Sequence, residues 1–257
     1  MDLDQLALEI CAARETKSLL EPPSRRMPAF SIEDGYVVGR QLHEQRLAAG
    51  ARPVGLKLGF TNEAVWEALG LTSPFWSPIY DDTVTEGPEV SLDRFVAPRI
   101  EPEIVLGFRS DLARDVAADD ICAAIDWAAP GFEIVQCHYP DWAMASADAI
   151  ADGGLHGTLV IGERVSRPMS AESLASTKVT LQRRGEVIAR GSGADALGGP
   201  IEAIAWLLRL PGIEGLPAGS IVTTGTLTAA IPIIAGERWR LACDGPTLHD
   251  QLDVVFP

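Results

Sequence analysis

Two glutamates separated by one residue are the part of the sequence best suited to chemistry. Glu101 and Glu103 flank Pro102, and an apolar run from Ile104 to Leu106 follows them. In a β-strand, residues i and i+2 point to the same face, so the two carboxylates would lie together. Like charges that close are unfavourable unless a proton or a cation lies between them, and a hard cation such as Mg²⁺ prefers oxygen ligands. The pair predicts a metal site, although two exposed acids on a solvated edge strand would give the same pattern.

Glu133 is a third acid in a setting where charge is unusual. It lies within the apolar segment from Phe132 to Val135. A buried glutamate usually has a partner, because an isolated buried charge is costly. An arginine could be that partner, and so could a cation shared with Glu101 and Glu103. This segment alone leaves both interpretations open.

Lys57 is a cation in a similarly apolar setting. It stands between Leu56 and Leu58, with Gly55 and Gly59 outside them. Glycine lets other groups approach the backbone closely, and a partly buried ammonium could bind a substrate carboxylate as a point charge. A surface lysine on an edge strand is the alternative.

Periodicity and capping signals predict the elements that must position these residues. Ser31, with Asp34 three residues later, is a capping pair for a helix that ends near Gly50. The expected helices cover residues 2–20, 31–50, 62–69, 119–128 and 200–209.

Short β-branched runs predict strands in the later part of the chain. The expected strands cover residues 100–108, 132–137, 158–161, 178–182, 221–223 and 238–241. Because Pro102 has no N–H for a strand ladder, its strand is expected to be an edge or to bulge there. The overall pattern predicts an α+β protein, with a smaller helical or α/β region over residues 1–90 and a strand-rich domain over residues 91–257.

The bulk composition limits the classes of partner. A formal net charge of −15 over 257 residues disfavours binding to nucleic acid and to anionic membranes. None of the four cysteines forms a C-x-x-C pair, and no apolar run approaches the roughly 18 residues that span a bilayer. The N-terminus is acidic, unlike a secretory signal. These features predict a cytoplasmic protein with reduced thiols.

Several blocks in a fixed order resemble one known family. On them the sequence is similar to the 2-keto-4-pentenoate hydratase group, which includes 4-oxalocrotonate decarboxylases and belongs to the fumarylacetoacetate hydrolase superfamily. The resemblance extends over roughly residues 30–256. The blocks are Gly55-Leu56-Lys57-Leu58-Gly59-Phe60-Thr61, Tyr80-Asp81-Asp82, Pro98-Arg99-Ile100-Glu101-Pro102-Glu103-Ile104, Phe132-Glu133-Ile134-Val135 and Gly225-Thr226-Leu227-Thr228.

The resemblance implies a fold and a set of site residues. The fold would be a mixed β-roll core with a smaller N-terminal region, and the cofactor Mg²⁺ or Mn²⁺. The family's metal ligands fall on Glu101, Glu103 and Glu133. Its pocket lysine falls on Lys57 and its pocket aspartate on Asp81. Thr226 is expected among the substrate-binding residues.

Two segments depart from the family pattern. Gln136-Cys137-His138 stands where many hydratases have Asp-Ser-Arg, and Gly153-Gly154-Leu155-His156 stands where they have Asn-Ala-Ser-Ser. Gln136 and Leu155 are therefore expected to shape the substrate pocket. His138 could pack against Asp141 or Trp142 as structure, or act at the site, and His156 is expected to act in catalysis as a general acid or base.

These residues support chemistry on a small 2-oxo acid. A divalent cation could stabilise an enolate, Lys57 could hold the substrate carboxylate, and Asp81 or His156 could move the proton. We expect a hydratase that adds water to a 2-hydroxy-2,4-dienoate and gives a 4-hydroxy-2-oxo acid. Decarboxylation or C–C hydrolysis of an oxalocrotonate-type or acylpyruvate-type acid is the alternative within enzymes. A non-catalytic metal-bound binding protein is the alternative outside them. Resemblance also implies a homo-oligomer.

Overall fold

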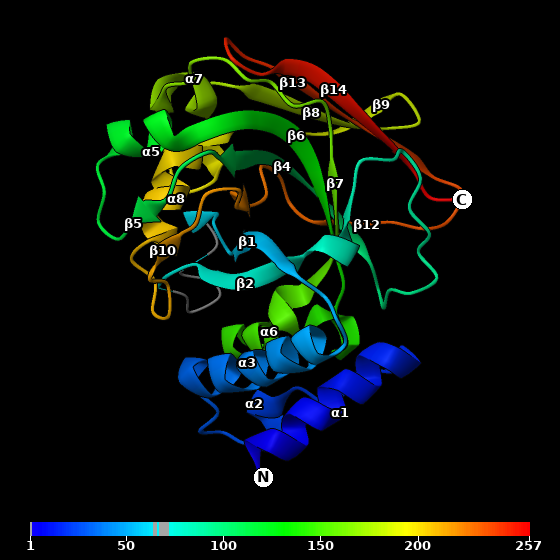
Figure 1. The fold of residues 1–257 in the computed structure, drawn as a ribbon. Coiled ribbons are helices and arrows are strands. Elements are labelled where there is room, and N and C mark those ends of the chain that lie inside the picture. Colours follow the sequence, from blue (N-terminus) through cyan, green and yellow to red (C-terminus); the bar gives the residue numbers. More distant parts are fainter. Residues whose placement is uncertain (1, 64–65, 67–71) are drawn as a thin grey trace.

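A curled mixed sheet of eight strands forms the centre of the structure (Figure 1). The computed structural model describes residues 2–63, 66 and 72–257. The strands, in spatial order, are β2 (Phe75–Tyr80), β1 (Pro53–Gly59), β11 (Ile221–Thr223), β4 (Arg99–Phe108), β6 (Ile125–Val135), β7 (His156–Ile161) and β3 (Val84–Thr85), with β12 (Ile231–Pro232) paired to β4.

A second sheet of four strands covers one side of this sheet, at the top of Figure 1. The main hydrophobic cluster joins the two sheets, and Ile104 and Leu106 of β4 share it with Trp239 and Leu241. These side chains are fully buried, so their burial fixes the two sheets against each other. The strands are β14 (His249–Val255), β13 (Arg238–Asp244), β8 (Lys178–Arg183) and β9 (Glu186–Ser192), and a separate pair is formed by β5 (Leu112–Ala113) and β10 (Gly215–Leu216).

The helices form two groups in Figure 1. One group lies below β2 and packs around a small apolar cluster that includes Leu6, Ile10 and Val38. The other group lies at the upper left of the view, near β5 and β10. The first group is α1 (Leu3–Thr16), α2 (Pro23–Arg26), α3 (Ile32–Ala48) and α6 (Ser146–Ala151), and the second is α5 (Ala118–Ala124), α7 (Ala171–Ala175) and α8 (Pro200–Leu207).

Most of the elements expected from the sequence are present. The six expected strands correspond to β4, β6, β7, β8, β11 and β13, and α1, α3 and α8 correspond to three expected helices. The capping box of α3 is formed by Ser31 and Asp34 as expected. The helix expected over residues 62–69 falls largely outside the described residues.

The prediction of a helix over residues 119–128 was wrong for its last residues. The observed helix, α5, ends at Ala124, and β6 begins at Ile125. Trp127 and Ala128 pair instead with Gly107 and Leu106 of β4, so cross-strand pairing outweighs the local helical pattern.

The expectation of an edge strand at Pro102 was also wrong. β4 is an interior strand between β11 and β6, and its register shift against β6 lies at Gly107 and Phe108. Pro102 is tolerated because β11 pairs with β4 only from Val105 onwards, and the chain beside Pro102 is a loop whose Leu227 N–H donates to the Pro102 carbonyl at 2.9 Å. A missing N–H at such a gap costs no ladder hydrogen bond.

Residues on both sides of position 90 contribute to the large sheet. β1 pairs in parallel with β11, and β3 pairs in parallel with β7. The division into regions 1–90 and 91–257 stays a prediction. Among the described residues, no helix combines the length and the apolar character that crossing a membrane would need.

Ile104 provides a test of how β4 is anchored. Its side chain is fully buried, on the face of β4 opposite Glu103. Ile104→Ala should lower the free energy of unfolding by about 2–5 kcal/mol, because it leaves a cavity in the core. The control Val187→Ala removes a side chain that is 46% exposed and should change it by less than ~1 kcal/mol. Equal effects in chemical denaturation would contradict this packing.

Candidate metal centre

The sheet brings the three glutamates together. Glu101 and Glu103 are two residues apart on β4, and Glu133 of β6 stands directly opposite Glu101 in the antiparallel register. One carboxylate oxygen from each lies within 4.8 Å of the others. Glu103 and Glu133 are fully buried and Glu101 is partly exposed. The alternative of solvated acids on an edge strand is therefore wrong.

Each buried carboxylate has one oxygen fixed and one oxygen without a hydrogen bond. The backbone N–H of Gly225 donates to Glu103 Oε2 at 2.7 Å, and His156 Nδ1 lies 2.8 Å from Glu133 Oε1. Among the described residues, neither Glu103 Oε1 nor Glu133 Oε2 has a hydrogen-bond partner, although Lys57 Nζ lies 3.3 Å from Glu133 Oε2. Buried carboxylate oxygens without hydrogen bonds are costly unless cations compensate their charge. The donor set is all oxygen, so the residues fit a hard divalent cation such as Mg²⁺ or Mn²⁺.

Lys57 faces the same cluster from β1. Its side chain is 3% exposed, and Nζ donates to the Gly154 carbonyl at 3.0 Å. Nζ also lies 3.3 Å from Glu133 Oε2 in an ion pair. The alternative of a surface lysine on an edge strand was wrong, because β1 lies between β2 and β11. Glu133 pairs with Lys57 and His156 rather than with an arginine.

Burial and mutual repulsion control the protonation of this cluster. Burial raises the pKa of Glu101 to about 7, with the charge of Lys57 opposing the rise. Burial and the charges of the other two glutamates hold the pKa of Glu103 well above its usual value. Burial also disfavours the ionised form of Glu133, but Lys57 and His156 outweigh it and lower its pKa. Burial disfavours the Lys57 ammonium too, yet the glutamates raise its pKa, so it stays charged.

His156 is hydrogen-bonded at both ring nitrogens. It is 4% exposed at the start of β7, and Nε2 lies 2.9 Å from the hydroxyl oxygen of Thr83. Thr83 ends the short helix η2 (Asp81–Thr83), which follows β2. Burial lowers the pKa of His156, which favours the neutral imidazole. His156 therefore contacts the glutamate cluster, and its expected catalytic role stays a prediction.

His138 has a structural contact, but with a different partner from those expected. Its Nδ1 lies 2.8 Å from a carboxylate oxygen of Asp152, not against Asp141 or Trp142. Arg14 of α1 forms an ion pair with the other oxygen of Asp152 at 2.8 Å. The three residues tie α1 to the loop that precedes His156.

Asp81 is not brought together with the glutamates. Its carboxylate accepts from the backbone N–H of Arg52 at 2.9 Å and from the Arg52 guanidinium at 2.8 Å. These two hydrogen bonds lower the pKa of Asp81. Its place at the start of η2 makes it part of the turn that carries Thr83.

The other three residues expected to bind substrate, besides Lys57, lie in different settings. Gln136 is buried, and its amide accepts from the Val96 N–H at 3.3 Å. Leu155 is buried in the turn η4 (Gly153–Leu155) before His156. The Thr226 hydroxyl donates to the Thr228 carbonyl at 2.8 Å, within the loop that supplies the Gly225 N–H. Gln136 and Leu155 thus adjoin His156, and Thr226 adjoins Gly225.

Two glycines at the site were not singled out as site residues. A Cβ on Gly225, whose φ is +101°, would lie 1.9 Å from the Thr61 hydroxyl oxygen. A Cβ on Gly154 would lie 2.4 Å from the Ser77 Cβ. Only glycine lets these two backbones come close enough to contact Glu103 and Lys57. The feature of the sequence that could have indicated them is the glycine itself, in the segments Gly225-Thr226 and Gly153-Gly154.

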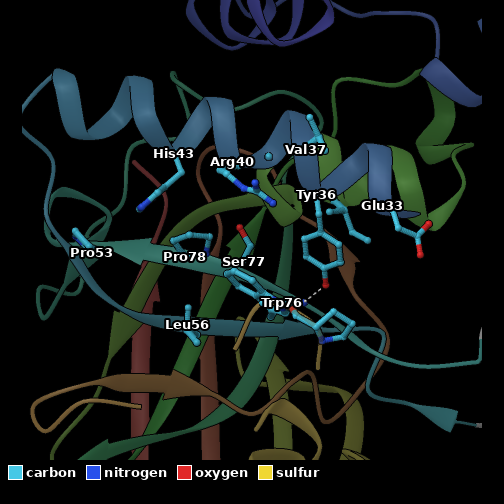
Figure 2. A pocket seen from close by; sticks show the side chains of 14 residues that line it. Glu33, Tyr36, Val37, Arg40, His43, Pro53, Leu56, Trp76, Ser77 and Pro78 are labelled. Carbon is cyan, nitrogen blue, oxygen red and sulfur yellow. Dashed lines mark hydrogen bonds between the residues drawn. The ribbon is translucent and has the colours of Figure 1, made fainter. Parts of the chain in front are cut away.

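A separate cavity of about 700 Å³ lies between α3 and the strands β1 and β2. Figure 2 shows Arg40 and His43 extending from α3 towards these strands, with Tyr36 beside Trp76. None of the three glutamates lines it, and neither does Lys57. It adjoins the site through Ser77, which lines the cavity and donates to the Gly153 carbonyl at 2.8 Å.

Comparison with known proteins identifies the family. The profile of the fumarylacetoacetate (FAA) hydrolase C-terminal family matches residues 62–249. The chain belongs to this family. A 2-hydroxyhexa-2,4-dienoate hydratase of Comamonas testosteroni is 33% identical over 232 residues, which cover 88% of each protein. A 4-oxalocrotonate decarboxylase of a Pseudomonas species is 32% identical over 215 residues, which cover 82% of this chain and 83% of the relative.

A solved structure supports the same assignment. The 4-oxalocrotonate decarboxylase from Pseudomonas putida G7, complexed with magnesium and adipate, has a TM-score of 0.90 and 27% identity, covering 99% of this chain and 97% of that chain. The expected resemblance and the expected fold, a mixed α+β β-roll of the fumarylacetoacetate hydrolase type, are both confirmed.

The raised pKa of Glu101 predicts how the stability of the protein depends on pH and on metal. The pKa of this carboxyl is about 7 in the folded protein and 4.5 when the group is unperturbed, so the folded state binds the proton more tightly. The metal-free protein should therefore lose stability as the pH rises from 4.5 to about 7. Mg²⁺ requires ionised carboxylates, so it should stabilise the protein more at about pH 8 than at about pH 6. Thermal unfolding with Mg²⁺ and with EDTA measures both effects.

Glu101→Gln is the matched control, because it keeps the shape of the side chain and removes its proton equilibrium. This variant should show a weaker dependence of metal-free stability on pH. The same pH dependence in the variant and the natural chain would contradict the assignment of the effect to Glu101.

Proposed function

We propose that this protein is a hydratase dependent on a divalent metal, which adds water to a 2-hydroxy-2,4-dienoate and gives a 4-hydroxy-2-oxo acid. The observation that carries the proposal is the pair of buried carboxylate oxygens, Glu103 Oε1 and Glu133 Oε2, left without hydrogen bonds beside the charged Lys57. The names of the hydratase relatives support the substrate class.

Glu101, Glu103 and Glu133 would hold the metal. Bound there, Mg²⁺ or Mn²⁺ supplies Lewis-acid stabilisation of negative charge on a 2-oxo acid. The complexes of related proteins with magnesium, with calcium and with Mn²⁺ support this choice of cofactor. The glutamates come to the reaction already oriented, because the sheet register and the Gly225 N–H fix them before substrate arrives.

Lys57 is the residue we assign to the substrate carboxylate. Its ammonium donates to the Gly154 carbonyl and lies 3.3 Å from Glu133 Oε2 in an ion pair. A proton that Gly154 does not use can donate to the substrate carboxylate. The charge also opposes the build-up of negative charge on the substrate in the transition state.

The proposed hydration shifts one proton within the substrate and adds one molecule of water. The dienol loses its 2-hydroxyl proton and gains one at C5, which gives a conjugated ketone, and water then adds OH at C4 and H at C3. Of the two proton carriers expected from the sequence, Asp81 is held by Arg52, and His156 has both ring nitrogens engaged. We therefore assign neither Asp81 nor His156 as the proton carrier.

Decarboxylation of a related 2-oxo acid is the second candidate. It is favoured by the high structural similarity to a 4-oxalocrotonate decarboxylase. A non-catalytic metal-bound protein is a weaker candidate, because the buried charge of Lys57 serves no purpose in a scaffold. The substrate is a small molecule, and the homo-oligomer, the cytoplasmic location and the lack of nucleic acid or membrane partners stay predictions from the sequence.

An ultraviolet assay tests the proposed reaction. Purified protein with 2-hydroxypenta-2,4-dienoate and Mg²⁺ should remove the dienol absorbance and form a 4-hydroxy-2-oxo acid. EDTA and Glu103→Gln should each abolish the change, because both empty the metal site. Release of carbon dioxide from 4-oxalocrotonate, without turnover of the dienoate, would replace the hydratase by the decarboxylase.

Lys57→Met tests the role of the lysine. It should lower kcat/KM by about 100-fold or more, because it removes a charge that stabilises the transition state. Mn²⁺ should still bind, since the three glutamates are unchanged. The control Lys178→Met alters an exposed lysine on β8 and should keep full activity. Unchanged activity in Lys57→Met would contradict the proposed role.

A further inference from the structure

We propose that His156 is a positioning residue that orients Glu133 for the metal, and that Thr83 in turn fixes the imidazole. The inference rests on the metal site of the proposed function and extends it to two residues outside the ligand set. It gives His156 a role different from the proton carrier that the sequence suggested.

The contact between His156 and Glu133 has a defined direction when the metal site is in use. A carboxylate that binds a cation is ionised and has no proton to donate. The hydrogen bond of 2.8 Å therefore needs the proton on His156 Nδ1, which donates to Glu133 Oε1. With Oε1 held in this way, Oε2, which also faces Lys57 Nζ at 3.3 Å, is the oxygen left for the cation.

Thr83 fixes the other end of the ring. Its hydroxyl lies 2.9 Å from His156 Nε2 and 2.9 Å from the Tyr80 carbonyl, so one hydroxyl proton serves either contact. In a neutral imidazole with the proton on Nδ1, Nε2 accepts from the Thr83 hydroxyl. Thr83 is itself anchored, because the Thr158 hydroxyl donates to the Thr83 carbonyl at 2.8 Å.

The backbone of His156 is also held. Its carbonyl accepts from the Arg14 guanidinium at 2.9 Å, and the same guanidinium contacts Asp152. The Gln136 amide lies 3.5 Å from the same carbonyl. A ligand whose neighbours are fixed in this way binds its metal without reorganising, and loss of such an outer contact typically weakens metal binding.

The same geometry argues against a proton-transfer role. His156 is 4% exposed, and both nitrogens already have partners. A ring that exchanged protons with substrate would have to release Glu133 or Thr83 in every cycle. The positioning role requires no such movement.

Two substitutions separate the two ends of the ring. The amide nitrogen of asparagine occupies the place of histidine Nδ1, and that of glutamine occupies the place of Nε2. His156→Asn therefore keeps a donor for Glu133, whereas His156→Gln keeps only the contact with Thr83. In calorimetric titration with Mn²⁺ and no substrate, His156→Gln should bind about 10- to 100-fold more weakly, and His156→Asn within about threefold of the natural chain.

Further variants control for general damage. Thr83→Val removes the contact with Nε2 but keeps the Nδ1 donor, so it should weaken Mn²⁺ binding by no more than about threefold, and Thr83→Ser, which keeps the hydroxyl, should restore it. His249→Gln alters an exposed histidine on β14 and should bind Mn²⁺ normally. Thermal unfolding of each metal-free variant shows whether it is folded.

The outcomes distinguish this inference from the proposed function. Failure of the natural chain to bind Mn²⁺ would overturn the metal site and the inference with it. Normal binding by the natural chain, with equal affinity in folded His156→Asn and His156→Gln, would overturn the positioning role alone. The reverse result, weak Mn²⁺ binding by His156→Asn and normal binding by His156→Gln, would mean that the contact with Thr83 matters and the contact with Glu133 does not. The inference would then be wrong.

Discussion

Three glutamates place one carboxylate oxygen each within 4.8 Å of the others, and their repulsion is the main electrostatic cost in this fold. Two of them are fully buried, where water cannot screen their repulsion. Lys57 supplies one positive charge, which leaves an excess of negative charge when all three are ionised. Without a cation the cluster must hold protons, and the raised pKa values of Glu101 and Glu103 express that cost. A divalent ion removes the need for those protons.

The surrounding elements are arranged so that the cluster cannot relax. β4 and β6 place the glutamates opposite each other through ten paired positions of one ladder, and β1 brings Lys57 from two strands away. The Gly225 N–H then fixes one oxygen of Glu103, and His156, at the start of β7, fixes one oxygen of Glu133. The packing of the two sheets offsets the cost of holding like charges together. Rigid elements that hold site residues in position are common where a site must be formed before substrate binds.

The sequence predicted which glutamates come together better than it predicted their surroundings. Glu101 and Glu103 could be recognised because a strand brings residues i and i+2 to one face, which is a local rule. Glu133 needed the additional assumption that two strands pair in one register. The resemblance to a known family supplied that assumption, and no local pattern did.

Contacts between distant segments could not be predicted in this way. Gly225 is 122 positions from Glu103, and Arg14 is 138 positions from Asp152. Thr83 gave no signal, because one threonine in a turn is ordinary. The strands β2, β9 and β14 were missed as well. Asp81 looked functional within its motif, but the fold pairs it with Arg52 at the surface. Topology decides such cases, and it is a property of the whole chain.

The position of a bound metal ion is the measurement to make first. Crystals grown with Mn²⁺ and measured near the manganese absorption edge would locate the ion by anomalous scattering. We predict one strong peak in contact with Glu101, Glu103 Oε1 and Glu133 Oε2, with His156 still bonded to Glu133 Oε1. Peaks only elsewhere on this acidic surface, or an empty cluster at saturating Mn²⁺, would contradict it.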